Sequence, residues 1–65
     1  MEFSEKLKCV RQKLDISQMA LAKELGVAFT TINRWENERV MPNYRAIKKF
    51  DEFCKKNNVK FESEE

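Results

Sequence analysis

The sequence predicts a small all-α domain built from four short helices. Apolar residues recur at three- and four-residue spacing in separate stretches, which is the pattern of helices that bury one face. The single glycine and the single proline, Gly26 and Pro42, both fall between such stretches. With 65 residues the chain makes one domain, close to the lower size limit for a core that folds without help.

The first helix is expected over residues 4–14. Phe3, Leu7, Val10 and Leu14 follow one another at helical spacing, and the other positions include the basic residues Lys6, Lys8, Arg11 and Lys13. This stretch therefore predicts an amphipathic surface helix.

A second helix is expected over residues 18–25, with Ser17 as its N-cap. Ala22 is small enough to let another helix cross closely. Gly26 stands where a helix ends in a left-handed residue, a conformation that glycine adopts without steric cost. A short turn that contains glycine and joins two helices is typical of the helix-turn-helix motif.

The third helix is expected over residues 29–37 and begins poorly, because Ala28 has no side-chain acceptor for an N-cap. At about 100° per residue, its hydrogen-bonding side chains fall on one side and its packing side chains on the other. The first set is Thr30, Asn33, Arg34 and Asn37, and the second is Ile32 and Trp35. Such a helix, held out by a small scaffold, suits insertion into the major groove of DNA.

A fourth helix is expected over residues 44–57, with Asn43 as its N-cap and Asn57-Asn58 as a stop signal. Its apolar stripe is predicted to contain Ile47, Phe50, Phe53 and Cys54. The predicted organisation is a domain over residues 1–58 and a short acidic tail over residues 59–65.

The net charge of +2 is small, but its distribution is uneven. Three of the 11 acidic residues are Glu62, Glu64 and Glu65, so the rest of the chain has 13 basic and 8 acidic residues. A basic body is compatible with binding a polyanion.

Several classes of function have no support in the composition. The chain lacks histidine, which is the usual general base and the commonest metal ligand, and it has no glycine-rich phosphate loop. Cys9 and Cys54 could form one disulfide, but two reduced, half-buried thiols in a cytoplasmic protein are the favoured interpretation. No signal peptide or membrane-spanning run is evident. We expect no enzymatic activity, cofactor, metal or small-molecule ligand.

The chain resembles the Cro/repressor-type (XRE-like) helix-turn-helix family over about residues 3–56. The matching positions are Arg11 with Leu14, Ile16-Ser17-Gln18, Leu21-Ala22, Leu25-Gly26-Val27, Thr31-Ile32, Arg34-Trp35-Glu36-Asn37 and Pro42. The resemblance implies a lambda-repressor-like DNA-binding domain that commonly acts as a dimer on a partly palindromic operator. Many relatives have a fifth helix that serves in dimerisation, and none is evident here, so we expect four helices and at most five.

The resemblance also implies roles for individual residues. Gln18 and Asn37 correspond to phosphate contacts, and Arg11 and Glu36 to a salt bridge between the first and third helices. The positions that correspond to groove-facing residues are Ala28, Phe29, Thr30, Asn33 and Arg34. Further candidates for phosphate contact, close to the loop after the third helix, are Arg39, Tyr44 and Arg45. The family often has glycine where this chain has Glu38.

The side chains of the third helix suit particular partners. Arg34 can bond guanine O6 and N7 together, although a phosphate contact is an equal alternative, and Asn33 suits adenine. Phe29 could press on a thymine methyl group or fold back over the poorly capped helix start.

The leading hypothesis is a sequence-specific double-stranded DNA-binding transcriptional regulator, most simply a repressor that blocks polymerase. We expect a homodimer at least on DNA, and a free dimer could use Phe53, Val59 or Phe61. The alternative is a helix-turn-helix protein-interaction module, such as an antitoxin or adaptor, with Phe29, Val40 and Met41 against the partner.

Overall fold

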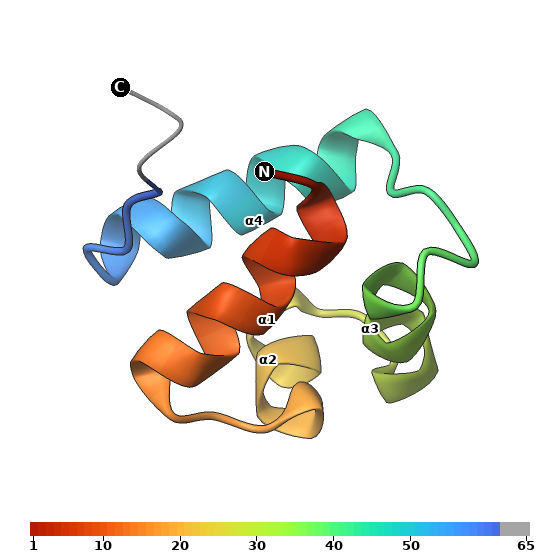
Figure 1. The fold of residues 1–65 in the computed structure, drawn as a ribbon, viewed down its shortest axis with the longest axis horizontal. Helices are drawn as coiled ribbons and strands as arrows, with labels where there is room; N and C mark the ends of the chain where they lie inside the picture. Colours follow the sequence, from red (N-terminus) through yellow and green to blue (C-terminus); the bar gives the residue numbers. More distant parts are fainter. Residues whose placement is uncertain (62–65) are drawn as a thin grey trace.

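The computed structural model describes residues 1–61, which form four helices and no strand. They are α1 (Phe3–Leu14), α2 (Gln18–Leu25), α3 (Phe29–Glu36) and α4 (Tyr44–Lys56) (Figure 1). The expected all-α fold is confirmed, and each helix begins and ends within one residue of its predicted bounds. None of these four helices has the length and apolar composition needed to traverse a bilayer.

Local capping explains where the helices begin and end. The Ser17 hydroxyl accepts a hydrogen bond from the Ala20 N–H at 3.0 Å, and Asn43 Oδ1 accepts one from the Ala46 N–H at 2.8 Å. Ala28 offers α3 no such bond. Gly26 ends α2 with a left-handed backbone, φ +69°, as expected of a glycine at this position.

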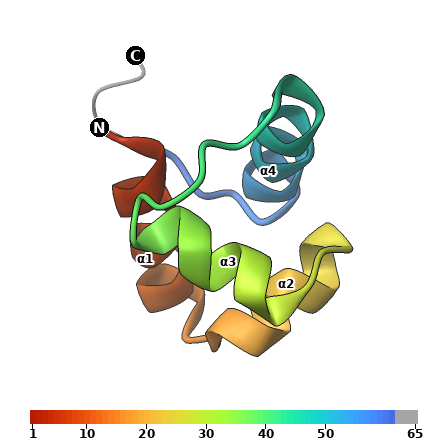
Figure 2. The ribbon, with the colours of Figure 1, turned by 90° about the vertical axis from the view of Figure 1, so that its right-hand side faces the viewer.

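The core lies where the four helices meet (Figures 1 and 2). Its largest fully buried side chains are Leu7, Val10, Leu21, Ile32 and Phe50. Phe3 packs edge-on against both Trp35 and Phe50, with ring centroids 5.6 and 5.2 Å apart. Trp35 is therefore a core residue, as its spacing from Ile32 predicts.

Both cysteines are free thiols, with Cys54 buried and Cys9 half-buried. Burial raises the pKa of the Cys54 thiol to about 11, so that thiol stays protonated at neutral pH. Within residues 1–61, no group of three or more histidine, cysteine or acidic side chains is arranged to hold a metal ion.

The predicted apolar stripe of α4 requires a correction at Ile47, whose side chain is 37% exposed. Ala46, Phe50 and Cys54 face the core instead, and Phe53 flanks them half-buried. Ala46, Phe50 and Cys54 are spaced four residues apart, so they lie one above another on the helix. Ile47 lies about 100° away from Ala46 around the helix axis.

The segment after α4 also differs from expectation. Asn58 adopts a left-handed backbone, φ +61°, and turns the chain back so that the Val59 N–H donates to the Cys54 carbonyl at 2.8 Å. Val59 and Phe61 are only 8% and 6% exposed, and Phe61 stacks on Phe50 with centroids 6.4 Å apart. The prediction that Val59 or Phe61 is available for a dimer interface is therefore wrong.

Two lysines of α1 cover the outer side of the Phe61 ring. Their Nζ atoms, on Lys6 and Lys13, lie 5.4 and 5.9 Å from its centroid, and Lys13 also donates to the Lys60 carbonyl at 3.0 Å. The described part of the predicted tail thus packs on the domain. Residues 62–65, with three of the acidic side chains assigned to that tail, lie outside the described residues, so a boundary at residue 58 stays a prediction.

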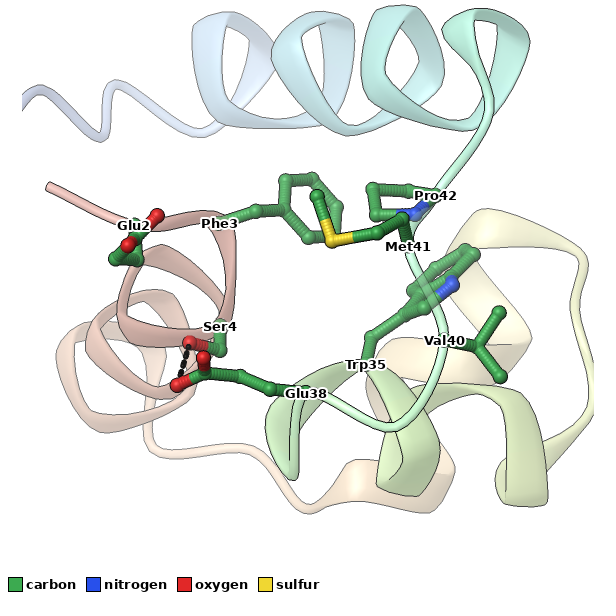
Figure 3. Close-up of a pocket in the computed structure, with 8 residues that line it drawn as sticks. All are labelled: Glu2, Phe3, Ser4, Trp35, Glu38, Val40, Met41 and Pro42. Atoms are coloured by element: carbon green, nitrogen blue, oxygen red, sulfur yellow. Dashed lines mark hydrogen bonds between the residues drawn. The ribbon is translucent and has the colours of Figure 1, made fainter.

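The loop between α3 and α4 contains a strained residue. Glu38 has a left-handed backbone, φ +57°, at the position where the family often has glycine. Its carboxylate accepts a hydrogen bond from the Ser4 hydroxyl at 3.3 Å, which ties the loop to the start of α1 (Figure 3). Phe3, Trp35 and Met41 line the small hollow between loop and helix, about 60 Å³ in volume.

We predict that Phe61→Ala lowers the free energy of unfolding by about 3 kcal/mol, because it removes a large aromatic group from the core. Met41→Ala is the control, since Met41 is 81% exposed, and its effect should stay within about 0.5 kcal/mol. Urea unfolding followed by circular dichroism measures both. Equal stabilities of the two variants would show that residues 59–61 do not belong to the core.

We also predict that Glu38→Gly is more stable than Glu38→Ala by about 1 kcal/mol, because only glycine adopts the left-handed backbone without strain. Both variants lose the carboxylate and the bond to Ser4, so the difference between their free energies of unfolding reflects the backbone conformation alone. At Glu52, which is exposed within α4, the alanine variant should instead be more stable than the glycine variant, by about 1 kcal/mol. A more stable alanine at residue 38 would contradict the strain.

Candidate nucleic-acid interface

Helix α3 lies across one face of the molecule, and Figure 2 looks onto that face. The start of α2 lies below α3 in this view, and the loop leading to α4 lies above it. Ile32, Trp35 and Glu36 are buried on the inner side of α3. Every predicted groove-facing position is exposed: Thr30, Asn33 and Arg34 on the outer side of α3, Phe29 at its first position and Ala28 at its N-cap.

The inner side of α3 is joined to α1 by an ion pair between residues 25 apart in the sequence. Arg11 Nε donates to Glu36 Oε2 at 2.7 Å, and Arg11 Nη2 donates to Glu36 Oε1 at 2.9 Å. The hydrogen bond to Glu36 raises the pKa of Arg11 above its ordinary value. The structure thus contains the salt bridge that the resemblance implies, and the charge of Glu36 is compensated inside the domain.

A hydrogen-bonded network of three side-chain amides, Gln18, Asn33 and Asn37, extends outward from Glu36. Gln18 Nε2 donates to Glu36 Oε1 at 3.0 Å, and Gln18 Oε1 accepts from Asn33 Nδ2 at 3.4 Å. Asn37 Nδ2 donates to Asn33 Oδ1 at 3.2 Å and to the Asn33 carbonyl at 2.8 Å. Two predicted phosphate contacts and one predicted base contact are therefore connected. Nothing in the sequence signals this amide network, because the spacing of Gln18 and Asn33 shows no regular pattern.

The cationic side chains on this face are available to an anion. The guanidinium groups of Arg34, Arg39 and Arg45 are exposed and have no hydrogen-bonding partner or carboxylate at ion-pair distance among residues 1–61. The two nearby carboxylates have different partners. Glu36 is buried and forms an ion pair with Arg11, and Glu38 accepts a hydrogen bond from the Ser4 hydroxyl. The charge of Glu36 is therefore compensated, whereas Glu38 is exposed and keeps its negative charge, because the Ser4 hydroxyl is neutral.

Three apolar side chains also reach the surface near α3. Phe29 is 44% exposed at the first position of the helix, so it covers the uncapped start only in part. Val40 and Met41 are exposed in the loop that follows α3. Tyr44, a predicted phosphate contact, is exposed at the first position of α4.

Comparison with known proteins assigns the chain to a family. The chain is 38% identical over 53 residues to the HTH-type transcriptional activator BcrR of Enterococcus faecalis, a match that covers 82% of this chain and 26% of that protein. The chain thus spans about a quarter of the length of this relative. No solved structure gives a significant match. A family model described as helix-turn-helix matches residues 7–57, which include most of α1 and all of α2, α3 and α4, and the chain therefore belongs to the XRE-type helix-turn-helix family.

Proposed function

We propose that this chain binds double-stranded DNA sequence-specifically and regulates transcription, with α3 in the major groove. The observation that carries this proposal is the exposed side of α3, where polar side chains accompany the Arg34 guanidinium, which has no carboxylate at ion-pair distance among residues 1–61. The function is binding rather than catalysis. Membership of the helix-turn-helix family and the regulatory relative support it. A DNA target also agrees with the expected cytoplasmic location.

The base contacts would come from the outer side of α3. Arg34 offers a planar pair of donors that fits guanine O6 and N7, and Asn33 offers the donor and acceptor that adenine requires. Thr30 can bond either kind of base edge. Ala28 and the exposed part of Phe29 would contact thymine methyl groups.

The phosphate contacts would frame α3 on both sides. Gln18 lies at the start of α2, where the free N–H groups and the helix dipole favour an anion. Asn37, Arg39, Tyr44 and Arg45 follow α3 along the loop and the first turn of α4. In the free protein both Gln18 and Asn37 donate to other side chains, so their phosphate contacts must share or replace these bonds.

Useful specificity requires two copies, because one domain of this size reads only a few base pairs. We propose a homodimer on two adjacent half-sites. Val59 and Phe61 are buried in the core, so of the three residues expected at a dimer interface only the half-buried Phe53 remains.

Repression is the simplest regulatory outcome, since a bound domain blocks polymerase without any further contact. Activation requires a second surface that contacts the transcription machinery. The relative named as an activator is about four times as long as the part that matches this chain.

A protein-interaction module is the second candidate, favoured by the exposure of Phe29, Val40 and Met41. An apolar protein contact responds little to salt. DNA binding through phosphates weakens steeply with salt, with a log–log slope of about 0.9 per neutralised phosphate. Titration with potassium chloride therefore separates the two functions.

We predict that wild-type protein enriches one motif from random duplex DNA and that Arg34→Ala loses the preference at a guanine, by about 1–3 kcal/mol. Arg45→Ala should instead weaken binding to all sequences equally and reduce the salt slope by about 0.9. Sequencing of the selected pools and anisotropy titrations measure these effects. Enrichment of no motif would contradict the proposed function, and an unchanged motif with Arg34→Ala would contradict the role of that residue.

We further predict that the enriched motif contains two inverted half-sites with centres about 10 base pairs apart or a multiple of that. A duplex with both half-sites should bind two chains, and a duplex with one should bind much more weakly. Mass measurement of the complex by light scattering gives the stoichiometry. A single chain bound with full affinity to one half-site would exclude the dimer.

A further inference from the structure

The side-chain amides of Gln18, Asn33 and Asn37 form a branch that begins at one carboxylate and ends on the exposed side of α3. The three links, from Glu36 outward, measure 3.0, 3.4 and 3.2 Å between donor and acceptor. The branch passes from a side chain that is 4% exposed to side chains in contact with solvent. It therefore connects the buried Glu36 carboxylate to residues that face outward.

Two groups that can only accept hydrogen bonds set the direction of the links: the Glu36 carboxylate at the inner end, and the Asn33 main-chain carbonyl, which accepts from Asn37 Nδ2 at 2.8 Å, at the outer end. An ionised carboxylate only accepts hydrogen bonds, so the NH₂ group of Gln18 must face Glu36. Gln18 Oε1 is then left to face Asn33, and an oxygen there requires the NH₂ group of Asn33 opposite it. Asn33 Oδ1 consequently faces Asn37, whose NH₂ group donates to it. Rotating one amide by 180° would place oxygen against oxygen or NH₂ against NH₂.

The Glu36 carboxylate, at the inner end of the network, is held in place by the cation that pairs with it. Glu36 accepts two hydrogen bonds from the Arg11 guanidinium, at 2.7 and 2.9 Å, in a bidentate arrangement. Both of its oxygens are thereby held, and Oε1 also accepts the bond from Gln18. The inner end of the amide network thus takes its direction from a buried, paired carboxylate, and the bond from Asn37 to the Asn33 carbonyl holds the outer end in the same sense.

After these contacts the Asn33 amide keeps hydrogen-bonding groups that the network does not use. An amide has two N–H donors and two acceptor lone pairs, and the contacts to Gln18 and Asn37 use one of each. One N–H and one lone pair remain in a fixed order. Adenine presents the matching pair in the major groove, an acceptor at N7 and a donor at N6.

We propose that Glu36, acting through Gln18, sets the orientation of the Asn33 amide and so specifies adenine at the base pair that Asn33 faces. Glu36 and Gln18 are positioning residues in this scheme, and Asn33 makes the base contact. The inference rests on the proposed DNA-binding function. It assigns to Gln18 a part in specificity in addition to the phosphate contact expected of it.

The network itself can be tested in the free protein. Gln18→Met keeps the length of the side chain and the Arg11–Glu36 pair but removes both amide links. In ¹⁵N–¹H spectra, the side-chain NH₂ resonances of Asn33 and of Asn37 should both shift, although Asn37 does not bond Gln18. Gln12→Met, an exposed substitution on α1, should move neither resonance. Unchanged Asn33 and Asn37 resonances in Gln18→Met would overturn the proposal.

The effect on recognition is tested by site selection from random duplex DNA with wild type, Gln18→Met, Asn33→Ala and Gln12→Met. The position where Asn33→Ala loses its adenine preference identifies the base pair read by Asn33. We expect Gln18→Met to lower that preference about 5- to 10-fold and to leave the guanine preference attributed to Arg34 in place. Thermal unfolding of each variant verifies that the domain is folded.

The outcomes are distinguishable. A role of Gln18 in phosphate contact alone would weaken binding to all sequences and leave every base preference unchanged, which would overturn the proposal. A wild-type protein that enriches no motif would instead contradict the proposed function, and the NMR measurement would still decide whether the network exists.

Discussion

A carboxylate on the buried side of α3 faces a guanidinium from α1, and the placement of α3 depends on this pair. A buried charge is costly unless it is paired and hydrogen-bonded, and removing one partner of such a pair typically costs about 3–5 kcal/mol. Glu36 meets the requirement through two bonds from Arg11 and one from Gln18. With eight residues, α3 is too short to persist alone, so its position is set by what its inner side contacts.

Apolar packing acts on the same side of α3. Ile32 and Trp35 are buried there, and Trp35 meets Phe3 from α1, which in turn meets Phe50 from α4. The ion pair and the aromatic contacts together hold the inner side against α1 and the core. Arg34, on the outer side, consequently has no partner in the described chain and is free to meet a ligand.

The parts of this structure that were predictable from the sequence are those with local causes. Helix bounds follow from caps such as Ser17 and Asn43, and the two sides of α3 follow from helical spacing. The Arg11–Glu36 pair joins residues 25 apart and was accessible only through resemblance to a family. Phe61 was missed because the acidic residues around it suggested a tail, whereas its ring packs on Phe50, and Val59, close to it in sequence, is also buried. Ala46 and Ile47 are neighbours in sequence, so spacing alone could not decide which of them faces inward.

The choice of a charged pair at the α1–α3 contact needs a physical reason, because apolar residues of similar volume often replace buried ion pairs without loss of stability. An apolar pair would hold the two helices together equally well. It would offer no acceptor to Gln18, however, and the Asn33 amide would then be held only from the side of Asn37. The pair provides a directional reference at the base of the proposed DNA-binding surface, since a carboxylate can only accept. The desolvation of Glu36 is offset by its bonds from Arg11 and Gln18, and the order that it imposes on the outer amides is a cost in side-chain entropy that the proposed recognition of DNA would explain.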